Sequence, residues 1–129
     1  MHNLIITQTP MRITLGGGGT DVIWYSKLKG GAWISAAIDK YVFVFINSTD
    51  DPNILKVFDG NRYFIVDKFI QIENQVIQEC LKITGLKKGI QITTVSEVSP
   101  RSGLGGSGSF AVGLLNGLYT YINKRIQIF

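Results

Sequence analysis

A glycine-rich segment in the C-terminal third of the chain holds the polar groups best suited to bind an anion. Residues 99–109 read SPRSGLGGSGS and join a strand-like run to a helix-like run. Four glycines allow the backbone to turn several N–H groups toward one point at the positive end of the helix. Ser107 and Ser109 add hydroxyl groups beside them. Because such a loop is typical of phosphate-binding sites, we predict that it holds the phosphates of a nucleotide.

A second glycine-rich segment lies near the N-terminus. Residues 10–21 read PMRITLGGGGTD, so Arg12 and Asp21 bracket four consecutive glycines. An arginine presents a fixed fork of donors to anionic oxygens, and a carboxylate accepts hydrogen bonds from sugar hydroxyls. Four glycines are costly to order, so they suit a tight turn or a close approach to a ligand. Two interpretations stay open: a turn between two elements, or a site where Arg12 and Asp21 converge on a polar ligand.

Two common phosphate-loop patterns do not account for residues 99–109. Gly103, Gly105 and Gly108 match G-x-G-x-x-G, but the acidic residue expected about 20 positions later is missing from residues 121–125. The P-loop pattern requires a lysine, and this loop contains none. The segment is therefore either a third type of phosphate loop or an ordinary strand-to-helix turn.

The elements that must position these loops follow from the hydrophobic pattern. Proline interrupts the first β-like run at Pro10, and Asp59-Gly60 marks a hairpin turn. Thr20 or Asp21 is expected to cap a short helix. The predicted strands are 4–8, 11–15, 33–37, 40–47, 54–58, 62–66 and 90–96, and the predicted helices run from 21 through 28, from 69 to 84 and from 110 to about 122. Together they predict one α+β domain, a mostly antiparallel sheet with helices packed on it.

Composition narrows the possible partners. The chain has 129 residues, 45% of them hydrophobic, which is enough for one domain with a core. Its net charge is +4, but the basic residues are scattered, so a nucleic-acid partner is not favoured. Cys80 is the single cysteine, and we expect a buried, inert thiol. No signal-peptide or membrane-span pattern is visible, so we expect a cytoplasmic protein without a membrane partner.

Both loops carry a family resemblance. The segments TPMRITLGGGGTD and SPRSGLGGSGSFAVGLLNGLY resemble the first and second motifs of the galactokinase, homoserine kinase, mevalonate kinase and phosphomevalonate kinase (GHMP) superfamily. Within it they are similar to kinases of D-glycero-D-manno-heptose 7-phosphate, as is GGAWISAAIDKYVFVFIN between them. The resemblance covers residues 9–124. It implies a ribosomal protein S5 domain 2-like N-terminal domain over residues 1–129, a sugar-phosphate substrate, and ATP and Mg²⁺ as cofactors.

The resemblance also implies roles for individual residues. It places the ATP phosphates on the second loop, at Pro100, Gly103, Leu104, Gly105, Gly106, Ser107, Gly108 and Ser109. Ser107 matches a serine that contacts Mg²⁺, and Arg12 matches an arginine that faces the transferring phosphoryl group. The sugar site would contain Arg12, Gly17, Gly18, Gly19, Thr20 and Asp21, with Asp21 accepting hydrogen bonds from the sugar. Gly18 and Gly19 replace the Glu-His pair of galactokinases, and we hypothesise that the vacated space admits a longer, phosphorylated sugar.

The chain departs from the family in its length. Family members have a C-terminal domain with a third glycine-rich motif, and their catalytic base and Mg²⁺-binding Glu lie beyond the second motif. We therefore expect a truncated N-terminal half, ending in the apolar tail 126–129, with no catalytic base and little activity alone. A C-terminal half or a second subunit would complete it.

The leading hypothesis is ATP-dependent phosphorylation of heptose 7-phosphate at its anomeric hydroxyl. The alternatives are a non-enzymatic S5-like binding module and a non-functional truncated remnant. Salt-sensitive RNA binding without MgATP binding would favour the binding module.

Overall fold

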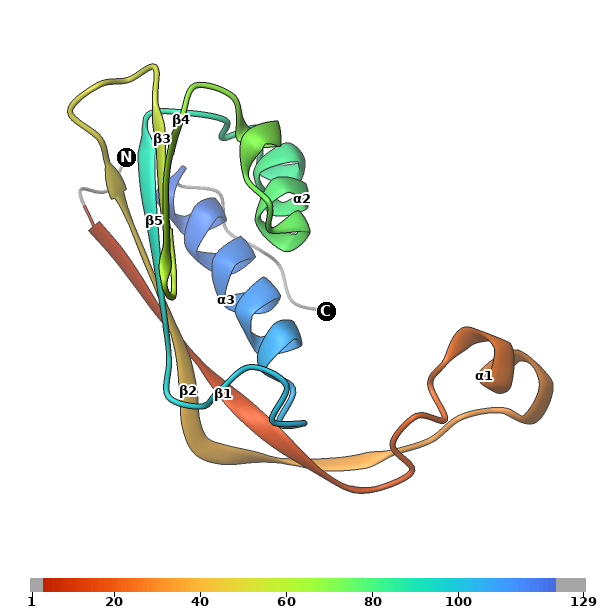
Figure 1. The fold of residues 1–129 in the computed structure, drawn as a ribbon. Coiled ribbons are helices and arrows are strands. Elements are labelled where there is room, and N and C mark those ends of the chain that lie inside the picture. The colour runs from red at the N-terminus through yellow and green to blue at the C-terminus, as the bar shows by residue number, and fades with distance from the viewer. Residues whose placement is uncertain (1–3, 123–129) are drawn as a thin grey trace.

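A five-stranded sheet with helices on one face forms the body of the protein (Figure 1). The computed structural model describes residues 4–122. Its elements are β1 (Leu4–Gly16), α1 (Ile23–Lys29), β2 (Ile34–Ser48), β3 (Leu55–Asp59), β4 (Arg62–Val66), the 3-10 helix η1 (Phe69–Gln71), α2 (Gln75–Thr84), β5 (Ile90–Ser96) and α3 (Gly106–Tyr121). The strand order is β1-β2-β5-β3-β4, and only the β3–β5 pair among these strands is parallel. The predicted α+β class with a mostly antiparallel sheet is confirmed.

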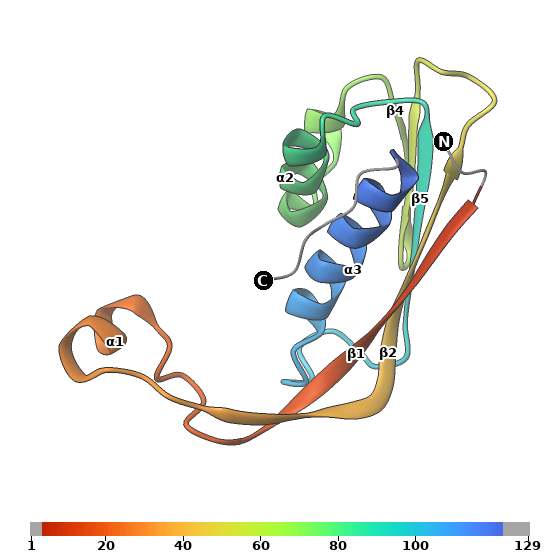
Figure 2. The ribbon, with the colours of Figure 1, turned by 180° about the vertical axis from the view of Figure 1, so that it is seen from behind.

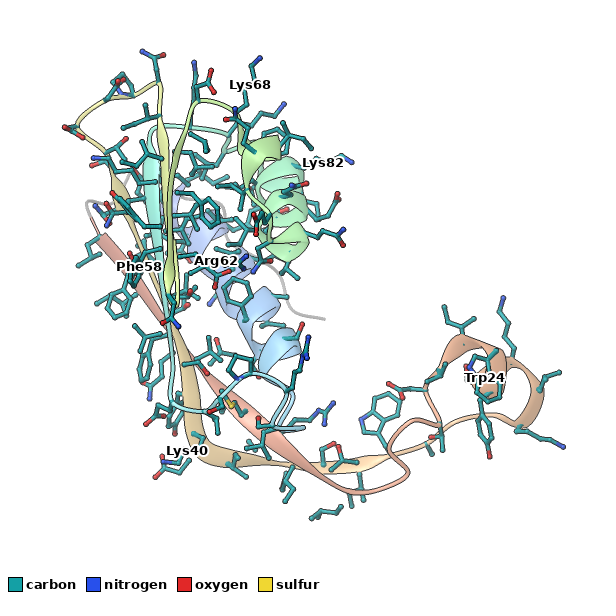
Figure 3. All side chains as sticks on the ribbon, in the orientation of Figure 1. Trp24, Lys40, Phe58, Arg62, Lys68 and Lys82 are labelled. Atoms are coloured by element: carbon teal, nitrogen blue, oxygen red, sulfur yellow. The ribbon has the colours of Figure 1, made fainter. Side chains whose placement is uncertain are left out.

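The two longest strands are continuous where the sequence predicted breaks. β1 passes through Pro10 without ending, and β2 joins the runs predicted at 33–37 and 40–47. The break predicted at Pro10 is present only as a shift in the pairing register between β1 and β2: Pro10 pairs with Tyr41, whereas Arg12 pairs with Ala37. β2 bends beside Lys40, at this shift (Figure 3). Proline is tolerated here since β1 is an edge strand.

The core lies between the sheet and the helices α2 and α3 (Figure 2). Alternate residues of the central strands are buried against leucines and isoleucines of the two helices: Val42, Val44, Ile46, Leu55, Val57, Ile90, Ile92, Ile77, Leu81, Leu114 and Leu118. Cys80 is 4% exposed in this core. Burial raises the pKa of its thiol, as expected for an inert cysteine.

The helix predicted over 69–84 is divided in two. The 3-10 turn η1 ends at Gln71, and α2 begins only at Gln75. Asn74 separates them because its side-chain oxygen accepts hydrogen bonds from the N–H groups of Val76 and Ile77, at 3.0 and 3.3 Å. The predicted end at Gly85 is correct, since this residue has a φ of 76° at the C-cap.

Two glycines let α3 lie directly against β1 and β2. A Cβ atom at Gly113 would be 2.5 Å from Thr9 Oγ1, and one at Gly117 would be 2.8 Å from Ile46 Cδ1. Thr7 Oγ1 donates a hydrogen bond to the carbonyl oxygen of Gly113 at 3.1 Å. This close packing fixes α3, and therefore its N-terminus, relative to β1.

The distal parts of β1 and β2 extend beyond the body and carry α1 at their end (Figures 1 and 2). We call residues 15–34 the arm. α1 contains no buried residue, and Trp24 and Leu28 are 70% and 79% exposed. The predicted cap by Thr20 or Asp21 is wrong, because Val22 is the N-cap and no side chain caps the helix. Thr20 is engaged elsewhere, in hydrogen bonds within the arm.

No helix within residues 4–122 is long and apolar enough to cross a lipid bilayer. The apolar tail expected at 126–129 and the outer limits of the predicted domain, 1–3 and 123–129, lie outside the described residues.

Candidate functional site

The glycine-rich loop 99–109 ends at the N-terminus of α3 and is joined to β1. The Arg12 N–H donates a hydrogen bond to the carbonyl oxygen of Leu104 at 2.9 Å. Gly103 and Gly105 have φ angles of 78° and 73°, a conformation that favours glycine. The N–H groups of the first helical turn, at Gly106 to Gly108, have no partner within the helix. The loop can therefore present these N–H groups to an anion.

The two serines of the loop have different surroundings. Ser107 is exposed and borders the main cleft of the protein. Ser109 donates its hydroxyl hydrogen to the carbonyl oxygen of Pro10 at 2.9 Å, and its N–H donates to Gly105 O at 3.0 Å. Both donors of Ser109 are therefore engaged within the chain, and its place among the phosphate-binding groups stays a prediction. In this structure Ser109 joins α3 to β1.

Arg12 connects the two predicted motifs. Its side chain packs on the second loop, where a Cβ atom at Gly105 would lie 3.0 Å from Arg12 Cγ and 3.3 Å from Nε. The guanidinium donates one hydrogen bond, from Nη1 to Thr14 Oγ1 at 2.6 Å. Within residues 4–122, no carboxylate forms an ion pair with Arg12. Its positive charge is therefore available to a ligand beside the loop.

The remaining residues of the first motif lie on the arm. A Cβ atom at Gly17 would be only 2.0 Å from Ala32 O, so this glycine allows the two sides of the arm to approach. Thr20 Oγ1 donates to Gly17 O and Ala32 O, at 2.7 and 3.0 Å, and accepts from Ala32 N at 3.1 Å. Thr20 was predicted as a sugar ligand, but here it holds the base of the arm together.

Asp21, Gly18 and Gly19 lie on the arm, and none of the three lines the cleft at the second loop. Asp21 is exposed at the start of the turn that leads into α1. The arm projects away from the N-terminus of α3 in both views (Figures 1 and 2). Gly19 has a φ of 85° with open space around its Cα, and Gly18 lies near the Thr14 methyl group. Arg12 thus packs against the second loop whereas Asp21 lies on the arm, and their convergence on one ligand stays a prediction.

A cleft of about 1180 Å³ begins at the second loop and runs along the helix-bearing side of the sheet. At one end it is lined by Gly103, Gly106 and Ser107, and at the other by residues 59–62 and Asn74. The volume is slightly above the about 300–1,000 Å³ typical of ligand pockets. Arg101, which has a φ of 65°, lies along the same cleft.

The far end of the cleft contains a hydrogen-bonded polar cluster that the sequence did not reveal. Asp59 Oδ2 accepts from Asn74 Nδ2 at 2.9 Å, and Asp59 Oδ1 accepts from Thr94 Oγ1 at 3.3 Å. Arg62 forms ion pairs with both Asp59 and Glu73. Asp59 and Thr94 meet because they are paired across the parallel strands β3 and β5. Only the Asp-Gly turn was visible in the sequence, and it indicated no more than a hairpin.

Comparisons with known proteins give the class of protein to which this fold and loop correspond. Residues 69–128 match the family model of the GHMP kinases N terminal domain. A mevalonate kinase structure from Methanococcus jannaschii has the same fold, with a TM-score of 0.73 at 20% identity, covering 95% of this chain and 42% of that one. Over residues 69–128, a little under half of its length, the chain is therefore similar to the N-terminal domain of the GHMP kinases.

Two of the similar proteins are named as heptose phosphate kinases. The chain is 30% identical, over 133 aligned positions, to the D-glycero-alpha-D-manno-heptose 7-phosphate kinase of Campylobacter jejuni. A D-glycero-D-manno-heptose 1-phosphate kinase structure from Bacteroides thetaiotaomicron superposes with a TM-score of 0.80 at 25% identity, covering 95% of this chain and 43% of that one. The alignment with this heptose 7-phosphate kinase covers 92% of the present chain but only 38% of the relative's own length. The chain thus spans about two-fifths of the proteins it matches.

Proposed function

We propose that this chain provides the nucleotide-binding half of a kinase that transfers phosphate from ATP to D-glycero-D-manno-heptose 7-phosphate, at the anomeric hydroxyl. The observation that carries the proposal is the second loop: Gly103, Gly106 and Ser107 line the cleft, and Arg12, which forms no ion pair with any residue of 4–122, packs on Gly105. The 30% identity to a heptose 7-phosphate kinase supports the choice of sugar.

The phosphates of ATP would lie on the N–H groups of Gly106, Ser107 and Gly108. Backbone donors at a helix N-terminus stabilise phosphate without any rearrangement of side chains. The nucleoside would then extend along the cleft toward Asn74, since the cleft leads from the loop to that residue. This orientation leaves the terminal phosphate near Arg12, which packs on the same loop.

Ser107 is the residue that would hold Mg²⁺. Its hydroxyl is exposed at the cleft, and it forms no side-chain hydrogen bond with any described residue. Mg²⁺ is commonly bound by few protein oxygens together with substrate phosphates, and one hydroxyl beside the phosphate position fits such a site. No group of three or more His, Cys, Asp or Glu side chains suited to a metal occurs in residues 4–122. When bound, Mg²⁺ neutralises charge on the phosphate oxygens. A carboxylate ligand would have to come from outside these residues.

Arg12 would stabilise the negative charge of the transferring phosphoryl group. An arginine has five N–H donors, and one of them is engaged with Thr14 here. The remaining donors can contact phosphate oxygens. Because phosphoryl transfer depends mainly on positioning and charge stabilisation, an arginine held by packing on Gly105 suits this role.

We further propose that additional polypeptide, a C-terminal half or a second subunit, packs on the arm and completes the sugar site. Trp24, Leu28 and Trp33 on the arm are 70%, 79% and 56% exposed, far more apolar surface than a helix of seven residues can sustain alone. Such packing would also supply the catalytic base. It would move or enclose Asp21 so that its carboxylate can reach the sugar hydroxyls.

The nucleotide part of the proposal is tested by titrating MgATP into the chain in a calorimeter. Gly103→Asp is expected to weaken binding at least tenfold, because it places a carboxylate beside the phosphates. Gly85→Asp is a matched control: both glycines have φ near 77°, and neither has an atom within 4 Å of an added Cβ. The control is expected to bind within twofold of the wild type.

Ser107→Ala sharpens the same experiment. It should reduce the affinity gained on adding Mg²⁺ while leaving the affinity for metal-free ATP unchanged. Equal MgATP affinity for Gly103→Asp and Gly85→Asp would overturn the proposed phosphate loop. No binding by the wild type at millimolar MgATP, together with salt-sensitive RNA binding, would favour the non-enzymatic binding module.

A further inference from the structure

The face of the sheet that carries no helix has a row of uncharged, mostly apolar side chains that crosses all five strands. Ile6 pairs with Phe45, Phe45 with Thr93, Thr93 with Phe58, and Phe58 with Tyr63. Side chains directly opposite each other in a sheet project from the same face. These five residues therefore form one uncharged row from the β1 edge to the β4 edge.

Neighbouring side chains widen this row into a patch. Phe43 pairs with Val95 one step along the strands, and the Phe58 and Tyr63 rings lie 6.2 Å apart. Figure 3 shows Phe58 projecting from the sheet on the side away from α2 and α3, whereas Arg62 projects toward the helices. We call this patch the outer face: Leu4, Ile6, Phe43, Phe45, Phe58, Tyr63, Ile65, Thr93 and Val95.

The outer face is substantially exposed. Ile6, Tyr63 and Ile65 are 54–56% exposed, Val95 is 48% exposed and Phe58 is 41% exposed. Since one large aromatic side chain buries about 150–250 Å² when fully covered, the exposed part of this patch is on the order of 600–800 Å². The largest apolar patch of a typical monomer is about 300–600 Å². A patch of this size indicates an interaction surface.

The central row contains no charged residue, and the neighbouring row on the same face is polar between its two ends: Leu4 and Ile65 are separated there by Asn47, Gln91 and Lys56. On this side of the central row Lys56 is paired with Asp50 at 2.9 Å. On the opposite side Tyr41 lies beside Asp39 and Glu97; hydrogen bonding to Asp39 and the charges of both carboxylates raise the pKa of Tyr41. An apolar centre with a polar rim is the usual anatomy of a protein–protein interface.

We propose that a second copy of this chain packs on the outer face, sheet against sheet, to form a two-fold symmetric dimer. The complement of a pleated apolar face is another such face, and sheets pack in this way about 10 Å apart. The area offered matches the roughly 800 Å² that each partner contributes to a standard interface. Because the central row is uncharged, two copies whose central rows meet bring no like charges together there, and Lys56 in the neighbouring row is already paired with Asp50.

This dimer leaves the proposed kinase site open. The cleft and both glycine-rich loops lie away from the outer face, since the cleft runs along the side of the sheet that carries the helices. Polypeptide packed on the arm would contact a different region again. The dimer therefore does not depend on the proposed function, and either can fail alone.

The test is sedimentation velocity of the chain from about 1 to 100 µM. The wild type should be dimeric at the upper concentrations. Thr93→Lys, which places two cations at the centre of the interface, should raise the dimer dissociation constant at least 100-fold. Tyr63→Lys, at the β4 edge, should raise it less. Thermal unfolding of each variant checks that the fold is retained, and Tyr63→Lys keeps the test valid should Thr93→Lys not fold.

Two control variants place the same charge elsewhere on the surface. Ile83 lies on α2 and is 60% exposed, and Leu28 lies on the arm. Ile83→Lys and Leu28→Lys should leave the dimer intact. A monomeric wild type at 100 µM would overturn the proposal. So would a dimer that persists in folded Thr93→Lys and Tyr63→Lys, or one that Leu28→Lys alone dissociates, since the arm would then be the interface.

Discussion

The two glycine-rich loops contain similar residues but are supported very differently. The second loop is attached to the body, through the hydrogen bond from Arg12 N to Leu104 O and the one from Ser109 Oγ to Pro10 O. The first loop is on the arm, and the side-chain hydrogen bonds of Thr20 stay within the arm. Support by the body preorganises a site, and preorganised donors are the ones that stabilise charge most effectively.

This difference separates what the chain can do alone from what it cannot. The phosphate-binding geometry of the second loop is present in the chain as it stands. The sugar-binding role of the first loop stays a prediction, because Asp21 belongs to the arm, which projects away from the body (Figure 1). We therefore expect variants of the second loop to affect nucleotide binding directly, and variants of the first to leave it unchanged.

The largest effect is expected for Gly105→Asp. The new Cβ would lie 3.0 Å from Arg12 Cγ, in a backbone conformation that disfavours side chains, and the carboxylate would repel phosphate. MgATP affinity measured by calorimetry should fall at least 100-fold, which corresponds to about 2.7 kcal/mol. Affinity within threefold of the wild type would contradict the contact between the two motifs.

A smaller effect is expected where the body supports the second loop. Gly113→Ala would place a Cβ 2.5 Å from Thr9 Oγ1, so α3 must move away from β1. We expect the free energy of unfolding, measured in urea, to fall by about 1–3 kcal/mol, as for other overpacked sites. Gly108→Ala is the control on the same helix, since no atom lies within 4 Å of its added Cβ. A stability loss equal in the two variants would mean that close packing is not the cause.

A local effect is expected at the first loop. Gly17→Ala would place a Cβ 2.0 Å from Ala32 O, at a φ of 77°, and should disrupt the base of the arm. Limited proteolysis should then cut the arm faster than in the wild type. MgATP affinity should stay within twofold, because the arm does not contact the second loop. A tenfold loss of MgATP affinity would show that the two loops are coupled.

The smallest effect on nucleotide binding is expected for Asp21→Ala. Asp21 is exposed on the arm and does not line the cleft at the second loop, so the MgATP affinity of this chain should not change. In an enzyme completed by further polypeptide, the same substitution should mainly raise the KM for the sugar phosphate. Steady-state kinetics with each substrate varied in turn separates an effect on the KM for the sugar phosphate from an effect on the KM for ATP. A raised KM for ATP alone would place Asp21 at the nucleotide instead.

The sequence predicted the elements well where local chemistry decides the structure. The Asp59-Gly60 hairpin turn, the helix end at Gly85 and the strand at 90–96 depend on short-range conformational preferences, and all three are present. The family resemblance of the two glycine-rich motifs implied that Arg12 faces the transferring phosphoryl group, and in the structure Arg12 packs on Gly105 of the second loop. The helix over 69–84 was predicted too long because an apolar period continues through residue 72, whereas the Asn74 cap ends that period locally.

Other features depend on long-range pairing that no local pattern contains. A loop hydroxyl can bind a ligand or hold the backbone, and only the partners distinguish the two, as the contacts of Thr20 and Ser109 show. Asp59 and Thr94 meet through the parallel β3–β5 pairing. The outer face likewise exists only once five strands are placed in order, since its central row takes one residue from each.

The comparison between the loops is tested most directly by following backbone amide signals by NMR during a MgATP titration. The account predicts shifts at Gly106, Ser107 and Gly108 and along the cleft to Asn74, with the amides of Asp21 and Trp24 unchanged. Shifts confined to the arm, or spread over the surface lysines without any at the start of α3, would contradict it.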